Sequence, residues 1–120
     1  MSEYDNKQRI IQELVPGKQI SLAHIMANPD PILFEKLGIS APDEEGGSAI
    51  GVMTISPAET AVIIADLAVK SSGVILELID LEQGSLIVTG TVSQVESSIA
   101  AVMEYCSRML GFSVCPVTKT

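Results

Sequence analysis

The sequence predicts an α+β sandwich in which helices cover one face of a mostly antiparallel sheet. Short β-prone apolar runs alternate with two longer segments whose apolar residues recur at helical spacing. Pro and Gly separate these runs, and 120 residues suit one domain with a real core. The expected order is strand, strand, helix, strand, helix, strand, strand, helix and strand.

The first expected strand is an early apolar run that stops at the Pro-Gly turn of residues 16–17. No tight hairpin signal joins this strand to the next one, so its open edge is expected to meet another chain. We place an N-terminal extension at residues 1–18 and the folded domain at residues 19–120. The strand consists of Ile10, Ile11, Gln12, Glu13, Leu14 and Val15.

The second strand is expected over residues 20–27, and it ends where two prolines follow Asn28, because proline cannot serve a central ladder. A short helix follows at residues 32–37. Gly38 suits the left-handed position that ends this helix. Residues 40–48 are acidic and rich in Gly, which predicts a flexible connector rather than a phosphate-binding loop.

A buried strand over residues 49–55 leads to the next predicted helix, at residues 60–69. Ser56 is expected to cap this helix, with Pro57 at the first helical position and Glu59 at the third. Apolar residues nearly encircle the helix, although a helix on one sheet needs only a stripe. We therefore expect a neighbouring subunit to cover the excess.

A hairpin is expected next, with strands at residues 74–80 and 85–92 around a turn at residues 81–84. Gly73 ends the preceding helix. Residues at such a tip are solvated, so Asp80 and Glu82 are not expected to work as a paired acid and base.

The last helix is predicted to open with a capping box from Ser93 to Glu96 and to stop at Gly111. A short strand at residues 112–117 closes the chain. The predicted buried face of the helix comprises Val95, Ile99, Val102, Met103, Cys106, Met109 and Leu110.

Composition excludes several classes of function. Fifteen acidic and seven basic residues give a net charge of -8, which repels phosphate backbones, so nucleic acid is not an expected partner. The polar N-terminus and the short apolar runs predict a cytosolic protein with no membrane contact. Cys106 and Cys115 are expected to be buried thiols in a reducing compartment.

No constellation for catalysis or metal binding is evident. The chain has one His, two Cys and no metal-ligand spacing, so we assign no catalytic residue, metal or cofactor. His24 is expected to be a packed or solvent-edge imidazole. An enzyme is therefore the weakest of the functions considered.

Motifs along most of the chain resemble one family, the circularly permuted bacterial microcompartment shell proteins that form hexamers in ethanolamine- and propanediol-utilisation compartments. In ordinary members a strand of Val-His-Val-Ile type, a proline turn and a short helix come last, whereas the similar segments come first here. The motifs are Ile11-Gln12-Glu13, Val15-Pro16-Gly17-Lys18-Gln19, Leu22-Ala23-His24, Asn28-Pro29, Lys36-Leu37-Gly38, Ala49-Ile50-Gly51 and Thr54-Ile55-Ser56-Pro57.

This resemblance implies a structural and transport role without catalysis. Hexamers of such proteins tile edge to edge into a thin shell around enzymes, and their sixfold axes act as pores. The implied partners are other copies of this chain, other shell proteins and encapsulated enzymes, in the shell of a compartment in the bacterial cytoplasm. The encapsulated pathway could be that of ethanolamine, propanediol or choline, because the sequence does not distinguish among the three.

The resemblance also assigns residues to places in the hexamer. Lys70 and Asn28 correspond to edge positions, although Lys70 is equally an i,i+4 partner for Asp66. The hairpin tip corresponds to the segment nearest the sixfold axis and is more acidic than in permuted relatives. This tip comprises Asp80, Leu81, Glu82, Gln83, Gly84 and Ser85.

In the permuted branch, the N-terminal strands of six subunits form a small parallel barrel over the axis. Residues 10–15 would supply that barrel here and would cap the pore. The alternative function is a small-molecule-sensing regulatory oligomer with a ferredoxin-like sandwich. A sensor binds a metabolite at a subunit cleft, whereas a shell protein associates through hexamer edges.

Overall fold

The computed structural model describes residues 17–39 and 47–120, and its fold class is the predicted α+β sandwich. One sheet has the strand order β3-β4-β2-β1-β5, with β6 also paired to β1. The first four strands pair antiparallel, and the two short C-terminal strands run parallel to β1. The strands are β1 (Gln19–Ala27), β2 (Ala49–Ser56), β3 (Ile75–Asp80), β4 (Ser85–Gly90), β5 (Ser113–Val114) and β6 (Thr118–Lys119).

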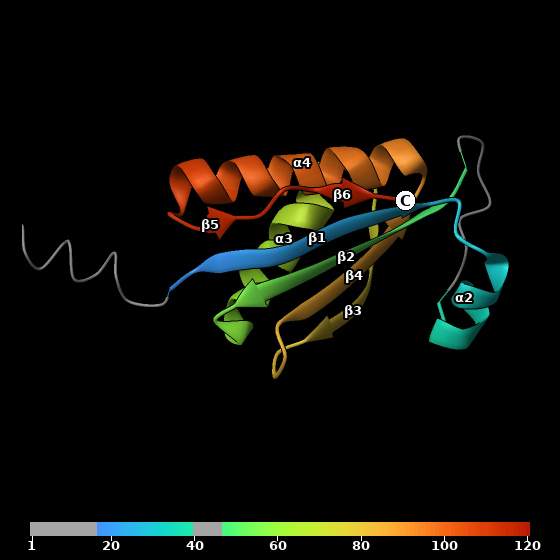
Figure 1. The fold of residues 1–120 in the computed structure, drawn as a ribbon, viewed down its shortest axis with the longest axis horizontal. Helices are drawn as coiled ribbons and strands as arrows, with labels where there is room; N and C mark the ends of the chain where they lie inside the picture. Colours follow the sequence, from blue (N-terminus) through green and yellow to red (C-terminus); the bar gives the residue numbers. More distant parts are fainter. Residues whose placement is uncertain (1–16, 40–46) are drawn as a thin grey trace, which may run out of the picture.

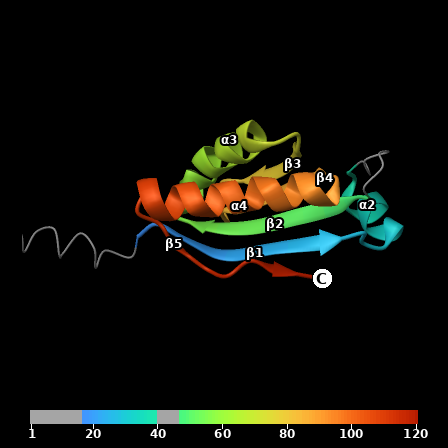
Figure 2. The same cartoon turned by 90° about the horizontal axis from the view of Figure 1, so that it is seen from above.

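Two helices cover one face of this sheet. Helices α3 (Ala61–Ser71) and α4 (Val92–Met109) lie beside each other on that face, while the short helix α2 (Pro31–Leu37) lies at one end of the sheet (Figures 1 and 2). Ser98 of α4 donates a hydrogen bond of 2.8 Å to the carbonyl of Ala68 in α3, which ties the two helices together inside the core.

The core fills the space between the sheet and these two helices. Its largest fully buried side chains come from all layers and include Ile20, Met53, Ile64, Leu86 and Ile99. Gly51 of β2 allows α4 to approach closely, since a Cβ there would lie 2.9 Å from the Cδ1 atom of Ile99. A helix covers β2 tightly because this position has no side chain.

The strands run between two distinct ends of the domain. At the tip end, residues 81–84 join β3 to β4, and Ile55 of β2 donates a backbone hydrogen bond of 2.7 Å to Gly84. At the opposite end, which we call the far end, Ala49 of β2 pairs with both Ala27 and Gly90. The first described residue, Gly17, lies near the tip end, because Gln19 pairs with Ser56.

The predicted cap of the first long helix is wrong. Ser56 stays in the sheet, paired with Gln19, so it is not available to cap a helix. A 3-10 turn (Ala58–Thr60) follows Pro57, and α3 begins at Ala61 without a side-chain cap. The hydroxyl of Thr60 donates instead to the carbonyl of Pro57 at 2.6 Å.

The capping box of α4 exists, but at a different place from the predicted Ser93–Glu96. The cap is Thr91, whose hydroxyl accepts from the backbone N–H of Gln94 at 3.2 Å, while the Gln94 side chain accepts from Thr91 at 2.9 Å. The fourth strand therefore ends at Gly90 rather than at residue 92. Thr91 and Gln94 form the same kind of capping box, and it begins two residues before the predicted one.

The predicted buried face of α4 is confirmed except at its end. Met109 is 65% exposed, and Leu110 is partly buried and packs against the core. Of the predicted last strand, residues 112–117, only Ser113–Val114 forms a strand, and β6 follows beyond it at Thr118–Lys119. Pro116, which has no N–H for a ladder, lies between the two. Gly38 ends α2 with φ of 71°, as predicted.

Some expectations concern residues that the structure does not describe. The strand predicted at residues 10–15 and most of the connector at residues 40–48 lie outside the described residues. Within residues 17–39 and 47–120, no helix is long and apolar enough to cross a membrane.

Candidate functional site

The first candidate functional feature is an exposed apolar surface, which we call the α3–β3 surface. α3 packs beside β3, the edge strand of the sheet, and together they leave large apolar side chains in solvent. The excess apolar residues predicted for this helix are therefore real and lie uncovered by the described part of the chain. The surface comprises Val62, Ile63, Val69, Ile75, Leu76, Leu78, Ile79 and Leu81.

One carboxylate interrupts this apolar surface on β3. The Glu77 side chain accepts a hydrogen bond of 2.7 Å from the hydroxyl of Thr89, which is fully buried in β4. A buried hydroxyl needs a partner, and this bond provides one. Glu77 is therefore fixed by the fold and stands at a defined place at the sheet edge.

The hairpin tip is shaped by Asp80 and Gly84. One oxygen of Asp80 accepts backbone hydrogen bonds from Glu82 at 2.9 Å and Gln83 at 3.2 Å, which closes the turn. Gly84 has φ of 76°, and a Cβ there would collide with the carbonyl oxygen of Ile55. Asp80 thus stabilises the turn. The exposed carboxylate at the tip is that of Glu82.

Lys70 and Asn28 both lie toward the far end. Lys70 Nζ lies 2.9 Å from the carboxylate of Asp66, and this hydrogen bond and charge raise the pKa of the exposed lysine. The expected i,i+4 pair is therefore confirmed. Asn28 has φ of 52°, and its side-chain oxygen accepts from the backbone of Ser48 at 3.2 Å, which links the ends of β1 and β2.

The structure thus separates the predicted site residues into two groups. Asp80 to Ser85 occupy the tip end, whereas Lys70, which precedes β3, and Asn28, which follows β1, lie at the other end of the strands. The placement is compatible with a tip near an axis and a rim at the opposite end. Contacts of these residues with another subunit remain a prediction.

The C-terminal residues pair with β1, and this pairing was not predicted from the sequence. Residues 113–120, which we call the strap, run along the outer edge of β1 (Figure 1). Backbone N–H groups of Ser113, Cys115 and Thr120 donate to β1 or the residue before it at 2.9–3.1 Å. The edge strand of this side is therefore covered by the chain's own end.

His24 anchors the strap. Its two ring nitrogens lie 2.6 Å from the hydroxyl of Thr118 and 3.0 Å from that of Thr120. Lys119 pairs with Glu96 of α4. The partners of His24 lie more than ninety residues away along the chain, so no local pattern could have identified this role.

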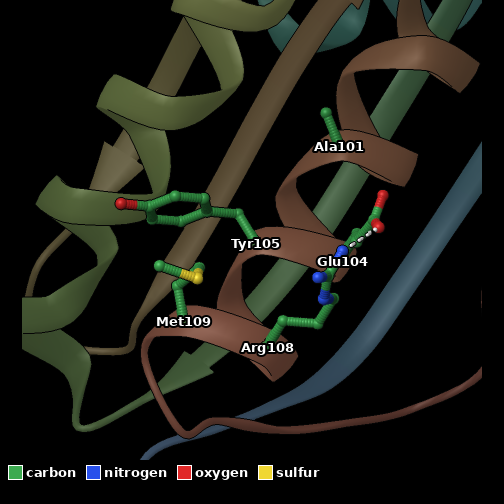
Figure 3. A pocket seen from close by; sticks show the side chains of 5 residues that line it. All are labelled: Ala101, Glu104, Tyr105, Arg108 and Met109. Carbon is green, nitrogen blue, oxygen red and sulfur yellow. Dashed lines mark hydrogen bonds and ion pairs between the residues drawn. The ribbon is translucent and has the colours of Figure 1, made fainter.

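A hollow of about 330 Å³ lies on the outer side of α4 (Figure 3). Ala101, Tyr105 and Met109 line it, and an ion pair of 2.9 Å between Glu104 and Arg108 borders it. All five residues come from one helix. The hollow is open, and it holds no convergent set of polar groups of the kind that a small-molecule site requires.

Reactive groups are sparse. Burial raises the pKa of the Cys106 thiol to about 11, which makes it a poor nucleophile. Within the described ranges, no three His, Cys, Asp or Glu side chains gather closely enough to hold a metal ion. The exposed surfaces described above are the candidate functional features.

The chain matches one family model and is similar to proteins of known name along its whole length. The model of the BMC domain matches residues 49–118. The bacterial microcompartment shell protein EutS of Salmonella typhimurium is 44% identical over 115 residues, which cover 96% of this chain and 99% of that protein. The shell protein PduU of the same organism is 41% identical over 120 residues and the full length of both chains.

Solved structures of the protein CutR are also similar to this chain. A flat hexamer of CutR has a TM-score of 0.78 at 42% identity, with 88% of this chain and 94% of that chain covered. CutR also occurs as a screw with a pitch of 41.9 Å, at a TM-score of 0.77 and 42% identity, with 88% of this chain and 100% of that chain covered.

Proposed function

The chain belongs to the BMC-domain family of bacterial microcompartment shell proteins, and we propose that it is a structural shell protein whose hexamers tile into the shell of a cytoplasmic compartment. The full-length likeness to named shell proteins carries this proposal. The α3–β3 surface supports it independently, because several large apolar side chains left exposed on neighbouring elements are typical of a subunit interface. The role involves no catalysis.

In the proposed hexamer, the hairpin tips converge on the sixfold axis. The strands then run radially, with Lys70 and Asn28 toward the rim, where neighbouring hexamers or other shell proteins would meet. Six copies of Glu82 would concentrate negative charge within about one Debye length, roughly 8 Å. Such a ring disfavours anions and tolerates neutral or cationic metabolites.

The N-terminal strand is proposed to cap this axis. Lys18 and Gln19 lie near the tip end, which is the side where six tips would meet in the proposed hexamer. Six such strands forming a parallel barrel would leave no open edge. Passage through the pore would then be restricted, and the cap would have to open or be bypassed.

A circular permutation is proposed for the domain. The family model matches only from residue 49 onward, whereas β1 and α2 precede that residue. In the sheet, β1 nevertheless lies directly beside β2 and completes the core through Ile20 and Ile25. The first element of the described residues thus occupies a central place in the fold.

Imaging of assemblies distinguishes this function from a regulatory sensor. A shell protein is expected to form sheets, tubes or curved arrays through hexamer edges in negative-stain images at raised concentration. A sensor would stay a discrete oligomer. Discrete particles at every concentration and salt condition, together with saturable binding of a metabolite, would contradict the shell function.

A further inference from the structure

We propose that Glu77 is a proton switch for assembly: its carboxyl takes up a proton when a second copy of this chain covers the α3–β3 surface, so assembly tightens as the pH falls. This role rests on the proposed function, which supplies the second copy as the occupant of that surface. It does not depend on where a symmetry axis lies. The acidity of the surroundings would then regulate how firmly the copies hold together.

Glu77 is the extra residue of a β-bulge in the edge strand β3. The register of β3 against β4 shifts between Leu76 and Leu78, so Glu77 has no partner opposite it in the ladder. A bulge re-aims the side chain at which it occurs. The Glu77 carboxylate here accepts a hydrogen bond of 2.7 Å from the hydroxyl of Thr89, which is fully buried. The backbone and one buried donor therefore hold this carboxylate in place.

Exposed apolar residues flank Glu77 along β3. Ile75 is 55% exposed, Leu78 is 43% exposed and Ile79 is 36% exposed, whereas Glu77 is itself partly buried. A partner that covers these apolar side chains also removes the Glu77 carboxylate from water. Apolar atoms cannot replace the hydration of a charged carboxylate, so burial there disfavours its charged form.

Within residues 17–39 and 47–120, the elements that pack against β3 offer Glu77 no free counter-ion. Asp80 is the other charged residue of β3, and β4 has none. On α3, which also packs against β3, Asp66 and Lys70 pair with each other at 2.9 Å. A second copy brings the same excess of acidic residues, fifteen against seven basic ones. Protonation is therefore the route by which this carboxyl is kept in a covered surface.

Assembly and proton uptake at Glu77 are linked. A carboxyl in contact with water is ionised at neutral pH, whereas the covered carboxyl in the assembly would hold a proton. Assembly then binds protons, so a falling pH favours it and a rising pH opposes it. One proton at each junction tightens that junction by up to about tenfold for each pH unit.

Sedimentation velocity of the full chain over a dilution series, repeated between about pH 7.5 and about pH 5.5, measures the concentration for half-assembly. Wild type should assemble at lower concentrations as the pH falls. Glu77→Gln keeps an oxygen that accepts from Thr89 but has no charge to bury. At about pH 7.5 its junctions should be at least about threefold tighter than those of wild type, and its response to pH should be weaker.

Glu35→Gln is the matched control for net charge. It removes the same single charge from an exposed position on α2, so it reports how much of the pH response comes from the overall acidity of the chain. This variant should keep the wild-type response to pH. The difference between Glu77→Gln and Glu35→Gln then belongs to the place of the carboxyl rather than to its charge alone.

Thr89→Val tests the hydrogen bond that positions Glu77. Valine has a similar shape but no hydroxyl, so the Glu77 carboxylate loses its buried donor and is free to turn toward water. The response to pH should then be weaker than in wild type, although Glu77 is still present. Circular dichroism would check that the variant folds, and a full wild-type response in the folded variant would overturn the role of Thr89.

Two results would overturn the proton switch. Glu77→Gln that assembles more weakly than wild type at neutral pH would mean that a cationic group of the partner holds the charged carboxylate. Glu77→Gln with the same response to pH as Glu35→Gln would place the proton uptake elsewhere. Wild type that stays a single copy at every pH and concentration would contradict the proposed function instead.

Discussion

Replacing Ile63 with alanine should weaken assembly while leaving the single chain almost unchanged. Ile63 lies on the outer side of α3 and is 48% exposed. Complete burial of an isoleucine contributes about 1.5–3 kcal/mol, so covering the exposed half in a junction contributes roughly 1 kcal/mol. Alanine also favours the helix by about 0.4 kcal/mol, which partly offsets the loss of the half that already packs within the chain.

The ring amplifies this small change. A loss of about 1 kcal/mol weakens one junction roughly fivefold. A closed six-membered ring has six such junctions but needs only five association steps, so the concentration for half-assembly should rise about eightfold. The free energy of unfolding, measured below that concentration, should change by less than about 1 kcal/mol.

Sedimentation velocity over a dilution series measures the assembly midpoint, and urea unfolding measures the stability of the chain. Met109→Ala, at a residue 65% exposed on α4, is the matched control and should leave the midpoint unchanged. The reasoning is refuted if Ile63→Ala keeps the wild-type midpoint but lowers the unfolding free energy by more than about 2 kcal/mol. Ile63 would then serve the core of its own chain.

Three further predictions concern the tip and the buried thiol. Gly84→Ala should lower the free energy of unfolding measured in urea, by about 1–2 kcal/mol for the left-handed backbone and by more for the collision with Ile55. Gly111→Ala, at a glycine with φ of 73° and open space around it, should show only the backbone cost. Glu82→Arg should reverse the preference of the pore for charged solutes in a permeation assay with reconstituted shells, and an unchanged preference would exclude Glu82 from the pore. Cys106 should resist thiol reagents at pH 8, where a pKa of about 11 leaves roughly one thiolate in a thousand, and Cys115 should react first. Because burial raises the Cys106 pKa above its ordinary 9.0, its contribution to stability is complete below pH 9 and is lost as the pH rises toward 11. Wild type should therefore lose stability more steeply than Cys106→Ala across that window in urea titrations.

Local patterns predicted most of the fold because each element has a local cause. The strands predicted at residues 20–27 and 49–55, the hairpin and the helix end at Gly38 follow from neighbouring residues, and the structure contains them. The nearly all-apolar character of α3 predicted an uncovered surface, which is present. The predicted caps at Ser56 and Ser93 are wrong because several polar residues compete near each helix start, and strand pairing decides among them.

The strap could not be predicted, since its cause is long-range. His24 meets Thr118 and Thr120 only after the sheet has formed. Pairing parallel to β1 also leaves no hairpin signal in the sequence. Composition thus indicated the α3–β3 surface, while the position of the strap depends on contacts across almost the whole chain.

Native mass spectrometry of the wild-type chain at micromolar concentration tests the central claim most directly. One chain has a mass of 12.7 kDa, so a closed ring of six copies should appear at about 76 kDa. That mass, retained on dilution over tenfold, is the predicted result. A stable species of 12.7 kDa under the same conditions would contradict the account.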